Sequence, residues 1–235
     1  MALDKLVDST LLDASLAYEA GKLRAKLGSS AQLDFDLANE KGFGDYIDAI
    51  PSGGGEDEIV ALCNNTLTSY SSTNILDVRV QLFLNCTHLT SISLPNAWRI
   101  QGNGLRNTGL TVFVGPKVTS VEDSGLSYNA QLTTVDILGR ATKSLYNGAL
   151  RNNSHLSVVI LRFNGVANNG GTSVFTSTPF AQNGTGGTLY VPQAQIDNYK
   201  AATNWSTILS YANNQILPIE GSIYETQHAD GTPVA

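Results

Sequence analysis

The chain has few charged residues, few cysteines and few histidines for its length. Of its 235 residues, 14% are charged, against about a quarter in an average domain. Its two cysteines, Cys63 and Cys86, are too few for a disulfide framework, and we expect both to be reduced. No C-x-x-C, H-E-x-x-H, G-x-S-x-G or phosphate-loop motif occurs. We therefore expect no metal, no cofactor and no catalytic residue, and predict that the protein is not an enzyme.

Long apolar runs are also missing. The start, MALDKLVDSTLLDAS, has charges every few residues and no apolar stretch of signal-peptide length. No stretch approaches the roughly 20 apolar residues of a membrane span. We therefore expect neither export by a signal peptide nor insertion into a membrane.

The net charge of −6 is unevenly placed along the chain. Residues 1–61 carry five Lys/Arg and twelve Asp/Glu, residues 62–191 carry eight and four, and residues 192–235 carry one and four. An acidic chain with a weakly basic middle lacks the clustered cations that nucleic acid needs. We expect no nucleic-acid partner, while a polyanionic glycan stays open.

A repeated apolar phrase is present between Leu62 and Val191. One apolar residue is followed five or six positions later by Leu and then by an alternating apolar pair. The four sets are Phe83, Leu89, Ile92 and Leu94; Leu105, Leu110, Val112 and Val114; Leu126, Leu132, Val135 and Ile137; and Leu150, Leu156, Val159 and Leu161. The opening residues lie 22, 21 and 24 positions apart, which is the spacing of leucine-rich repeats. We predict a solenoid whose turns share one core, with the alternating pairs pointing inward from short parallel strands.

A polar position recurs three residues after each opening residue, and a fifth opening is expected at Phe180. The residues at the polar position are Cys86, Thr108, Asn129, Asn153 and Asn183. We expect their side chains to bond backbone groups of the turns that would otherwise be unpaired.

The sequence divides into five segments of an α+β protein. Residues 1–50 form a small helical module, because apolar residues from Leu12 to Leu27 recur at helical spacing. Residues 51–58 are a glycine-rich linker, and residues 59–191 form the solenoid with a short parallel sheet. Residues 192–221 are a C-terminal helical cap, with Trp205 packed on the last turn. Residues 222–235 are polar, and we expect a frayed tail.

The N-terminal module resembles a segment found in many phage proteins. The matching residues are KLRAKLGSS at 22–30 and GFGDYIDAI at 42–50. They resemble the start of tail and minor structural proteins of phages that infect Gram-positive and gut bacteria, and depart from them by the insertion of Leu27 and of residues 39–41. The resemblance implies that the protein resides in the virion, where residues 1–50 contact other virion proteins.

The repeats themselves resemble a second family. The phrases FLNCTHLTSISLP and LSYNAQLTTVDI, with the closing segment LYVPQAQIDNYKAATNWSTI, are similar to the BspA-like leucine-rich repeats of bacterial surface adhesins and phage host-recognition proteins. Together the two resemblances imply a phage tail or fibre protein that displays its repeats for host-surface recognition. The alternatives are a decoration fibre of the head or tail without a receptor, and a bacterial surface adhesin, which the missing signal peptide disfavours.

Two surfaces are candidates for binding. Trp98 beside Arg99, with Lys143 on the same lateral stripe, is suited to a host cell-surface protein or glycan, although Trp98 folded over the edge of its turn is an open alternative. On the outer strand face, the side chains of Phe113, Val158, Ile160 and Tyr190 are expected to form an exposed apolar patch, with Asp136 pointing to solvent between them. Such a patch predicts a homo-oligomer, with a trimer favoured.

Overall fold

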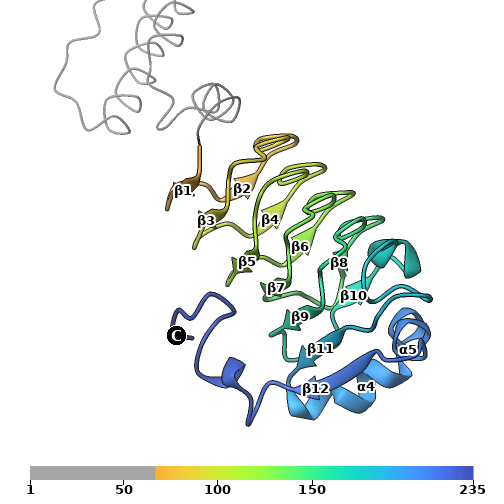
Figure 1. Ribbon diagram of the computed structural model, residues 1–235. Coiled ribbons are helices and arrows are strands. Elements are labelled where there is room, and N and C mark those ends of the chain that lie inside the picture. Colours follow the sequence, from red (N-terminus) through yellow and green to blue (C-terminus); the bar gives the residue numbers. More distant parts are fainter. Residues whose placement is uncertain (1–66, 235) are drawn as a thin grey trace, which may run out of the picture. The chain divides into compact units, whose positions relative to one another are not determined.

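The computed structural model describes residues 67–234, which belong to the second of the two units of the chain, 54–235. The predictions for the module 1–50 and the linker 51–58 lie outside these residues. The described part is α+β: short parallel strands are followed by short helices near the C-terminus (Figure 1). The strands are β1 (Ser69–Ser71), β2 (Asp77–Val78), β3 (Ser91–Ser93), β4 (Arg99–Ile100), β5 (Val112–Gly115), β6 (Ser120–Val121), β7 (Thr134–Ile137), β8 (Lys143–Leu145), β9 (Val158–Leu161), β10 (Asn168–Asn169), β11 (Thr188–Val191) and β12 (Gln215–Pro218). The helices are η2 (Thr172–Phe175), η3 (Gln193–Gln195), α4 (Ile196–Ala201), α5 (Thr203–Leu209) and η4 (Ile223–Glu225).

Successive strands alternate between two rows, as Figure 1 shows. One parallel sheet has the order β10-β8-β6-β4-β2 and the other the order β12-β11-β9-β7-β5, while β1 and β3 pair by themselves. Each pass of the chain therefore adds one strand to each row. Residues of successive passes become neighbours, as in the column of Phe113, Val135 and Val159.

The core lies between the rows and is built from equivalent residues of successive passes. Phe113, Val135, Val159 and Leu189 on one sheet are at most 1% exposed, and the opening residues Phe83, Leu105, Leu126 and Leu150 are 0% exposed. Complete burial of such a side chain stabilises a fold by about 1.5–3 kcal/mol. No single pass has enough residues to enclose its own apolar side chains, so the passes stabilise one another.

One strand differs from the prediction by one residue. Phe113 pairs with Val135 and points into the core, whereas its neighbours Val112 and Val114 are half-buried on the outer face. The spacing of three between the preceding Leu and the inward residue is the same in both passes, from Leu110 to Phe113 and from Leu132 to Val135. The segment from the opening residue to this Leu is shorter in the pass of Leu110 than in the pass of Leu132. The strand register is therefore set by the position of the Leu and not by that of the opening residue. The prediction of an inward Val112 and Val114 is therefore wrong.

Buried asparagines join neighbouring turns, as predicted. Asn129 donates from Nδ2 to the carbonyls of Leu105 and Leu126, each at 3.0 Å. Its Oδ1 accepts from the backbone N–H of Thr108 at 2.6 Å. One pass later Asn153 repeats the arrangement, and its Oδ1 accepts from the N–H of Asn129 at 2.7 Å. These side chains satisfy buried backbone groups that the short strands leave unpaired.

The last turn opens at Phe175, so the predicted opening at Phe180 is wrong. The amide of Leu150 donates to the carbonyl just before Phe175 at 3.2 Å, the same bond that precedes the opening residue in earlier turns. Thr178 takes the polar position and donates to the carbonyl of Phe175 at 2.7 Å. Asn183 therefore does not have the predicted role.

Cys86 is 1% exposed and disulfide-bonded. The expectation that it is reduced is wrong, and Cys63 lies outside the described residues. A framework of several bridges needs many cysteines, but a single bridge needs only two thiols that the fold brings together. Counting cysteines therefore could not exclude this bond.

The helical cap closes the C-terminal end as predicted, but it is divided. The helical part of the predicted cap 192–221 consists of η3, α4 and α5, with an extended residue, Ala202, between the two α-helices. Trp205 is 1% exposed and donates from its indole N–H to the carbonyl of Ala167 at 2.6 Å. The hydroxyl of Tyr199 accepts from the backbone N–H of Ala167 at 2.9 Å. Strand β12 then adds to β11 in parallel, which the sequence analysis did not predict.

Candidate functional site

The outer face of the sheet β5-β7-β9-β11-β12 is centred on Asp136, whose side chain is 0% exposed. Arg162, the residue after β9, holds both carboxylate oxygens through Nε at 2.7 Å and Nη2 at 2.8 Å. Two parallel donors on one carboxylate form a strong and directional pair. The prediction that Asp136 points freely to solvent is therefore wrong.

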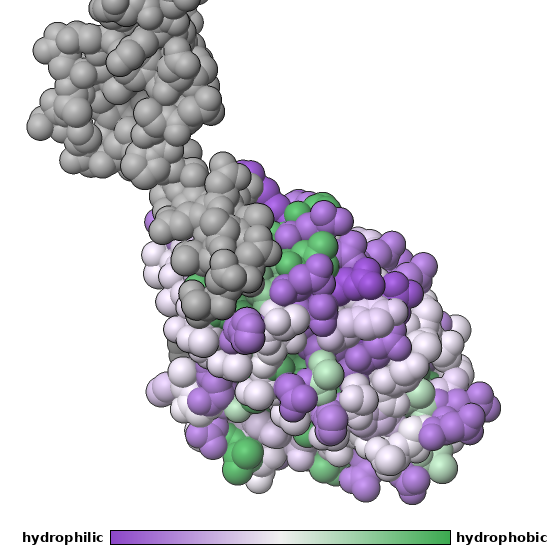
Figure 2. All heavy atoms as spheres, turned by 45° about the horizontal axis from the view of Figure 1, so that its top comes forward, coloured by the Kyte–Doolittle hydropathy of each residue, from purple (hydrophilic) through white to green (hydrophobic). Residues whose placement is uncertain are grey.

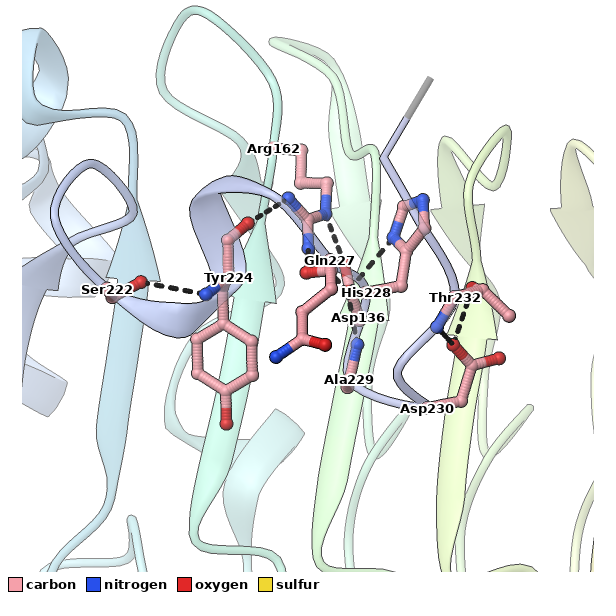
Figure 3. Close-up of polar contacts among 9 residues, drawn as sticks. All are labelled: Asp136, Arg162, Ser222, Tyr224, Gln227, His228, Ala229, Asp230 and Thr232. Carbon is pink, nitrogen blue, oxygen red and sulfur yellow. Dashed lines mark hydrogen bonds and ion pairs between the residues drawn. The ribbon is translucent and has the colours of Figure 1, made fainter.

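Residues 222–234 close over this pair, and we call them the C-terminal clasp (Figure 3). His228 Nδ1 lies 3.1 Å from Oδ2 of Asp136, and the amide of Ala229 donates to the same oxygen at 3.0 Å. Arg162 in turn donates to the carbonyls of Tyr224 at 2.8 Å and Gln227 at 3.1 Å. The predicted frayed tail is wrong, because its backbone satisfies buried charges on the sheet.

The predicted apolar patch is covered by the chain itself. Phe113 points into the core and Ile160 is 0% exposed, while Val158 and Tyr190 are half-buried. The ring of Tyr190 packs edge-on against Tyr224 of the clasp, with centroids 4.8 Å apart. Burial, followed by the nearby Tyr190 and Asp136, raises the pKa of Tyr224. The patch is therefore not an exposed interface, and the homo-oligomer has no support from it.

Exposed apolar side chains elsewhere are scattered. The described surface drawn in Figure 2 is mostly hydrophilic or weakly polar, with apolar residues in small groups. The large apolar side chains that stay exposed are Leu76, Val80, Trp98, Tyr128, Leu217 and Ile223.

Trp98 is the sequence-predicted binding residue that remains accessible, at 42% exposure. It immediately precedes β4, and the Arg99 Cζ atom lies 4.8 Å from the centre of its ring. Trp98 donates its amide to the carbonyl of Leu76 at 2.9 Å, and its carbonyl accepts from Thr119 at 2.8 Å. These bonds place Leu76, Trp98 and Thr119 next to one another on successive passes.

Arg99 is fixed by carboxylates on both sides. Strand pairing places it opposite Asp77, which accepts from its Nε at 3.0 Å and from its Nη2. Glu122 lies 3.5 Å from Nη1, and Gln101 also donates to Asp77 at 2.9 Å. The hydrogen bond with Asp77 is the main cause that raises the pKa of Arg99. The guanidinium beside Trp98 is therefore oriented, and its charge is more than balanced by two carboxylates.

Lys143 lies apart from this pair. It begins β8, which β6 separates from β4, so it is on the order of 10 Å away along the sheet. Its Nζ lies 4.3 Å from the ring centre of Tyr146. The structure thus brings Trp98 and Arg99 together but does not place Lys143 in contact with them.

The sequence analysis missed Arg162 and His228. A signal for the first was available, because Asp136 and Arg162 carry opposite charges near the same place in successive passes. No spacing pointed to His228, which lies in the polar tail.

No protein-family model matches the chain, and no curated protein matches it significantly. Within residues 67–234, no helix is long and apolar enough to cross a membrane. In the same range, no three His, Cys, Asp or Glu side chains are grouped so as to hold a metal ion.

Proposed function

We propose that this chain is a phage virion structural protein of tail or fibre type, whose BspA-like leucine-rich repeat solenoid binds the host surface. The repeat assignment is supported by the parallel pairing of strands from successive passes and by the buried Asn129 and Asn153. Residues 1–50 dock the protein onto other virion proteins. The solenoid is then displayed to the host cell.

The observation that carries the proposal is the oriented Trp98 platform. An indole ring that is half-exposed and stacked on a fixed guanidinium loses little freedom when a ligand covers it. Because Asp77 and Glu122 outweigh the charge of Arg99, the platform favours a neutral sugar ring or a protein partner over a polyanion. The disulfide at Cys86 also fits a protein that works outside the cell.

The covered strand face argues against the decoration fibre. A fibre without a receptor would bury its apolar strand face between subunits. Here Ile160 is already 0% exposed within a single chain, and the clasp packs on Tyr190 through Tyr224. The adhesin alternative shares the Trp98 platform and differs only in where the protein is carried.

Adsorption of the full chain to host cells tests the Trp98 platform. Trp98→Ala should weaken adsorption by about tenfold or more, which is typical of an aromatic at the centre of an interface. Ile223→Ala removes another exposed apolar side chain, at 63% exposure in the clasp, and serves as the control. Equal adsorption of the two variants would remove Trp98 from the site.

Assembly tests the docking role of residues 1–50. A fragment that starts at residue 56 should adsorb to cells like the full chain but stay out of the particle. Incorporation of this fragment into particles would show that the docking assignment is wrong.

A further inference from the structure

Tyr128 is out of place among equivalent turn residues. The position two residues after each opening residue has a left-handed backbone throughout. The residues there are Asn85, Asn107, Tyr128, Asn152 and Ser177, with φ between 55° and 63°. Asn tolerates this conformation, whereas a bulky side chain is strained in it. Tyr128 is also 40% exposed, so core packing does not compensate for the strain. Strain that the fold does not require points to a function.

Two arginines flank the Tyr128 ring. The Cζ atoms of Arg106 and Arg151 lie 4.5 Å and 5.8 Å from its centroid. They are therefore no farther apart than the sum of these distances, about 10 Å. The two side chains come from the passes before and after, because the amide of Tyr128 donates to the carbonyl of Arg151 at 3.0 Å, and that of Asn107 to Ser127 at 3.0 Å.

A glycine makes room for Arg151. A Cβ atom added to Gly148 would lie 2.8 Å from Cδ of Arg151, so any larger residue would displace this side chain. The stem of Arg151 thus lies over Gly148, and its guanidinium is directed toward the ring of Tyr128.

Within the described residues, no carboxylate compensates either guanidinium charge. Within residues 67–234, neither Arg106 nor Arg151 forms an ion pair with a carboxylate, in contrast to Arg99 and Arg162. Arg106 donates to the amide oxygen of Asn103 at 3.3 Å. The Nε of Arg151 is buried without a hydrogen-bond partner. A surface ligand would therefore be bound by the other N–H groups of this guanidinium and by those of Arg106.

We propose that Tyr128, Arg106 and Arg151 bind an anionic glycan, whose carboxylate or other oxyanion accepts from the guanidinium groups. A guanidinium fork matches an oxyanion in both charge and geometry. The Tyr128 hydroxyl and exposed ring edge offer a hydrogen bond and an apolar contact to the sugar. Tyr128 lies on the turn between β6 and β7, Arg106 on the turn between β4 and β5, and Arg151 on the turn between β8 and β9. The site shares no residue with the Trp98 platform and does not depend on the virion assignment.

Calorimetric titration of the full chain with tetragalacturonate tests the site. Arg106→Gln with Arg151→Gln should weaken binding by about tenfold or more, because two charge-assisted hydrogen bonds are lost. Lys117→Gln with Lys200→Gln removes the same charge elsewhere and should change affinity less than about twofold. Equal losses in the two double variants would overturn the proposal, since attraction would then be diffuse. Binding of neutral maltotetraose as tight as that of tetragalacturonate would overturn it as well.

Tyr128→Asn separates binding from folding. It introduces the residue type found at Asn85, Asn107 and Asn152, so the thermal midpoint should hold or rise while affinity falls several-fold. Unchanged affinity in this variant would contradict the role of the ring. Competition by a sulfated tetrasaccharide identifies the preferred oxyanion: tighter binding than tetragalacturonate assigns the site to sulfate, and weaker binding assigns it to carboxylate.

Discussion

His228 Nδ1 lies 3.1 Å from a carboxylate oxygen of Asp136, although 92 residues separate them along the chain. The contact fastens the C-terminal clasp to β7, which lies between β5 and β9 in its sheet. Because Arg162 bonds both Asp136 and two carbonyls of the clasp, one buried charge pair connects the two parts. The stability of the described part of the chain and the cover of the outer sheet face therefore depend on the same residues.

Removing Asp136 should strongly destabilise the protein. Asp136→Ala leaves the guanidinium of Arg162, 11% exposed, without its carboxylate, and breaking such a buried pair costs about 3–5 kcal/mol. Asp197→Ala, whose side chain is 98% exposed, should change the free energy of unfolding by under about 0.5 kcal/mol. Urea unfolding of both variants measures the difference. Similar values for the two would mean that the clasp does not hold Asp136 in solution.

Removing the clasp should uncover an adhesive surface. A chain that ends at Gly221 loses the clasp and with it the ring of Tyr224, which packs on Tyr190, the partner of the buried Ile160 in the β9–β11 pair. A contiguous apolar surface on a strand face promotes association. Light scattering after size exclusion should show a larger mass for the shortened chain than for the full chain at equal concentration. An unchanged mass would show that this face is not adhesive.

The buried asparagine ladder should be sensitive to truncation. Asn129→Ala leaves two carbonyls and the amide of Thr108 without partners, at about 1–3 kcal/mol for each buried group. We expect a loss above about 2 kcal/mol in the free energy of unfolding. Asn198→Ala, an exposed amide on α4, serves as the control and should stay within about 0.5 kcal/mol. A small effect at Asn129 would imply that water replaces its bonds.

The cap should weaken in alkali. Burial raises the pKa of Tyr199 above its ordinary 10.0, so above pH 10 the unfolded chain loses this proton while the folded chain keeps it. The contribution of the protonated Tyr199 to the free energy of unfolding is fully present below pH 10. It is lost as pH rises toward the folded-state pKa, by up to about 1.4 kcal/mol per pH unit. Tyr199→Phe should flatten this slope, as measured by unfolding at several alkaline pH values. The same slope in both proteins would contradict the assignment.

Local spacing was sufficient to predict the inward column and the polar ladder. Leu110 and Leu132 mark the position of the inward residue three places later, and Asn129 stands at a fixed distance from Leu126. The register of Phe113 was predicted wrongly because positions were counted from the opening residue. The passes differ in length between the opening residue and the following Leu, so positions should be counted from the Leu. Trp205 was predictable as a cap residue because it is a large apolar side chain that follows β11, where the predicted repeats end.

The clasp could not be predicted from spacing. Its contacts join residues 224–229 to Asp136 and Arg162, and no periodicity links positions so distant. Polar composition indicated a frayed tail, because such residues do not bury apolar surface. Here the backbone carbonyls and amides of the tail bind buried charges, and composition does not report on those groups. The Arg106–Tyr128–Arg151 cluster could not be predicted from the sequence either. The fold determines both the left-handed backbone of Tyr128 and the approach of the two arginines to its ring.

Electron microscopy of particles with a gold label at the C-terminus of this chain tests the central proposal most directly. The particles are those produced from the genome that encodes the chain. The proposal predicts label on purified particles, at a position on the tail or its fibres that faces the host cell. Label on the bacterial surface, with none on the particles, would contradict it.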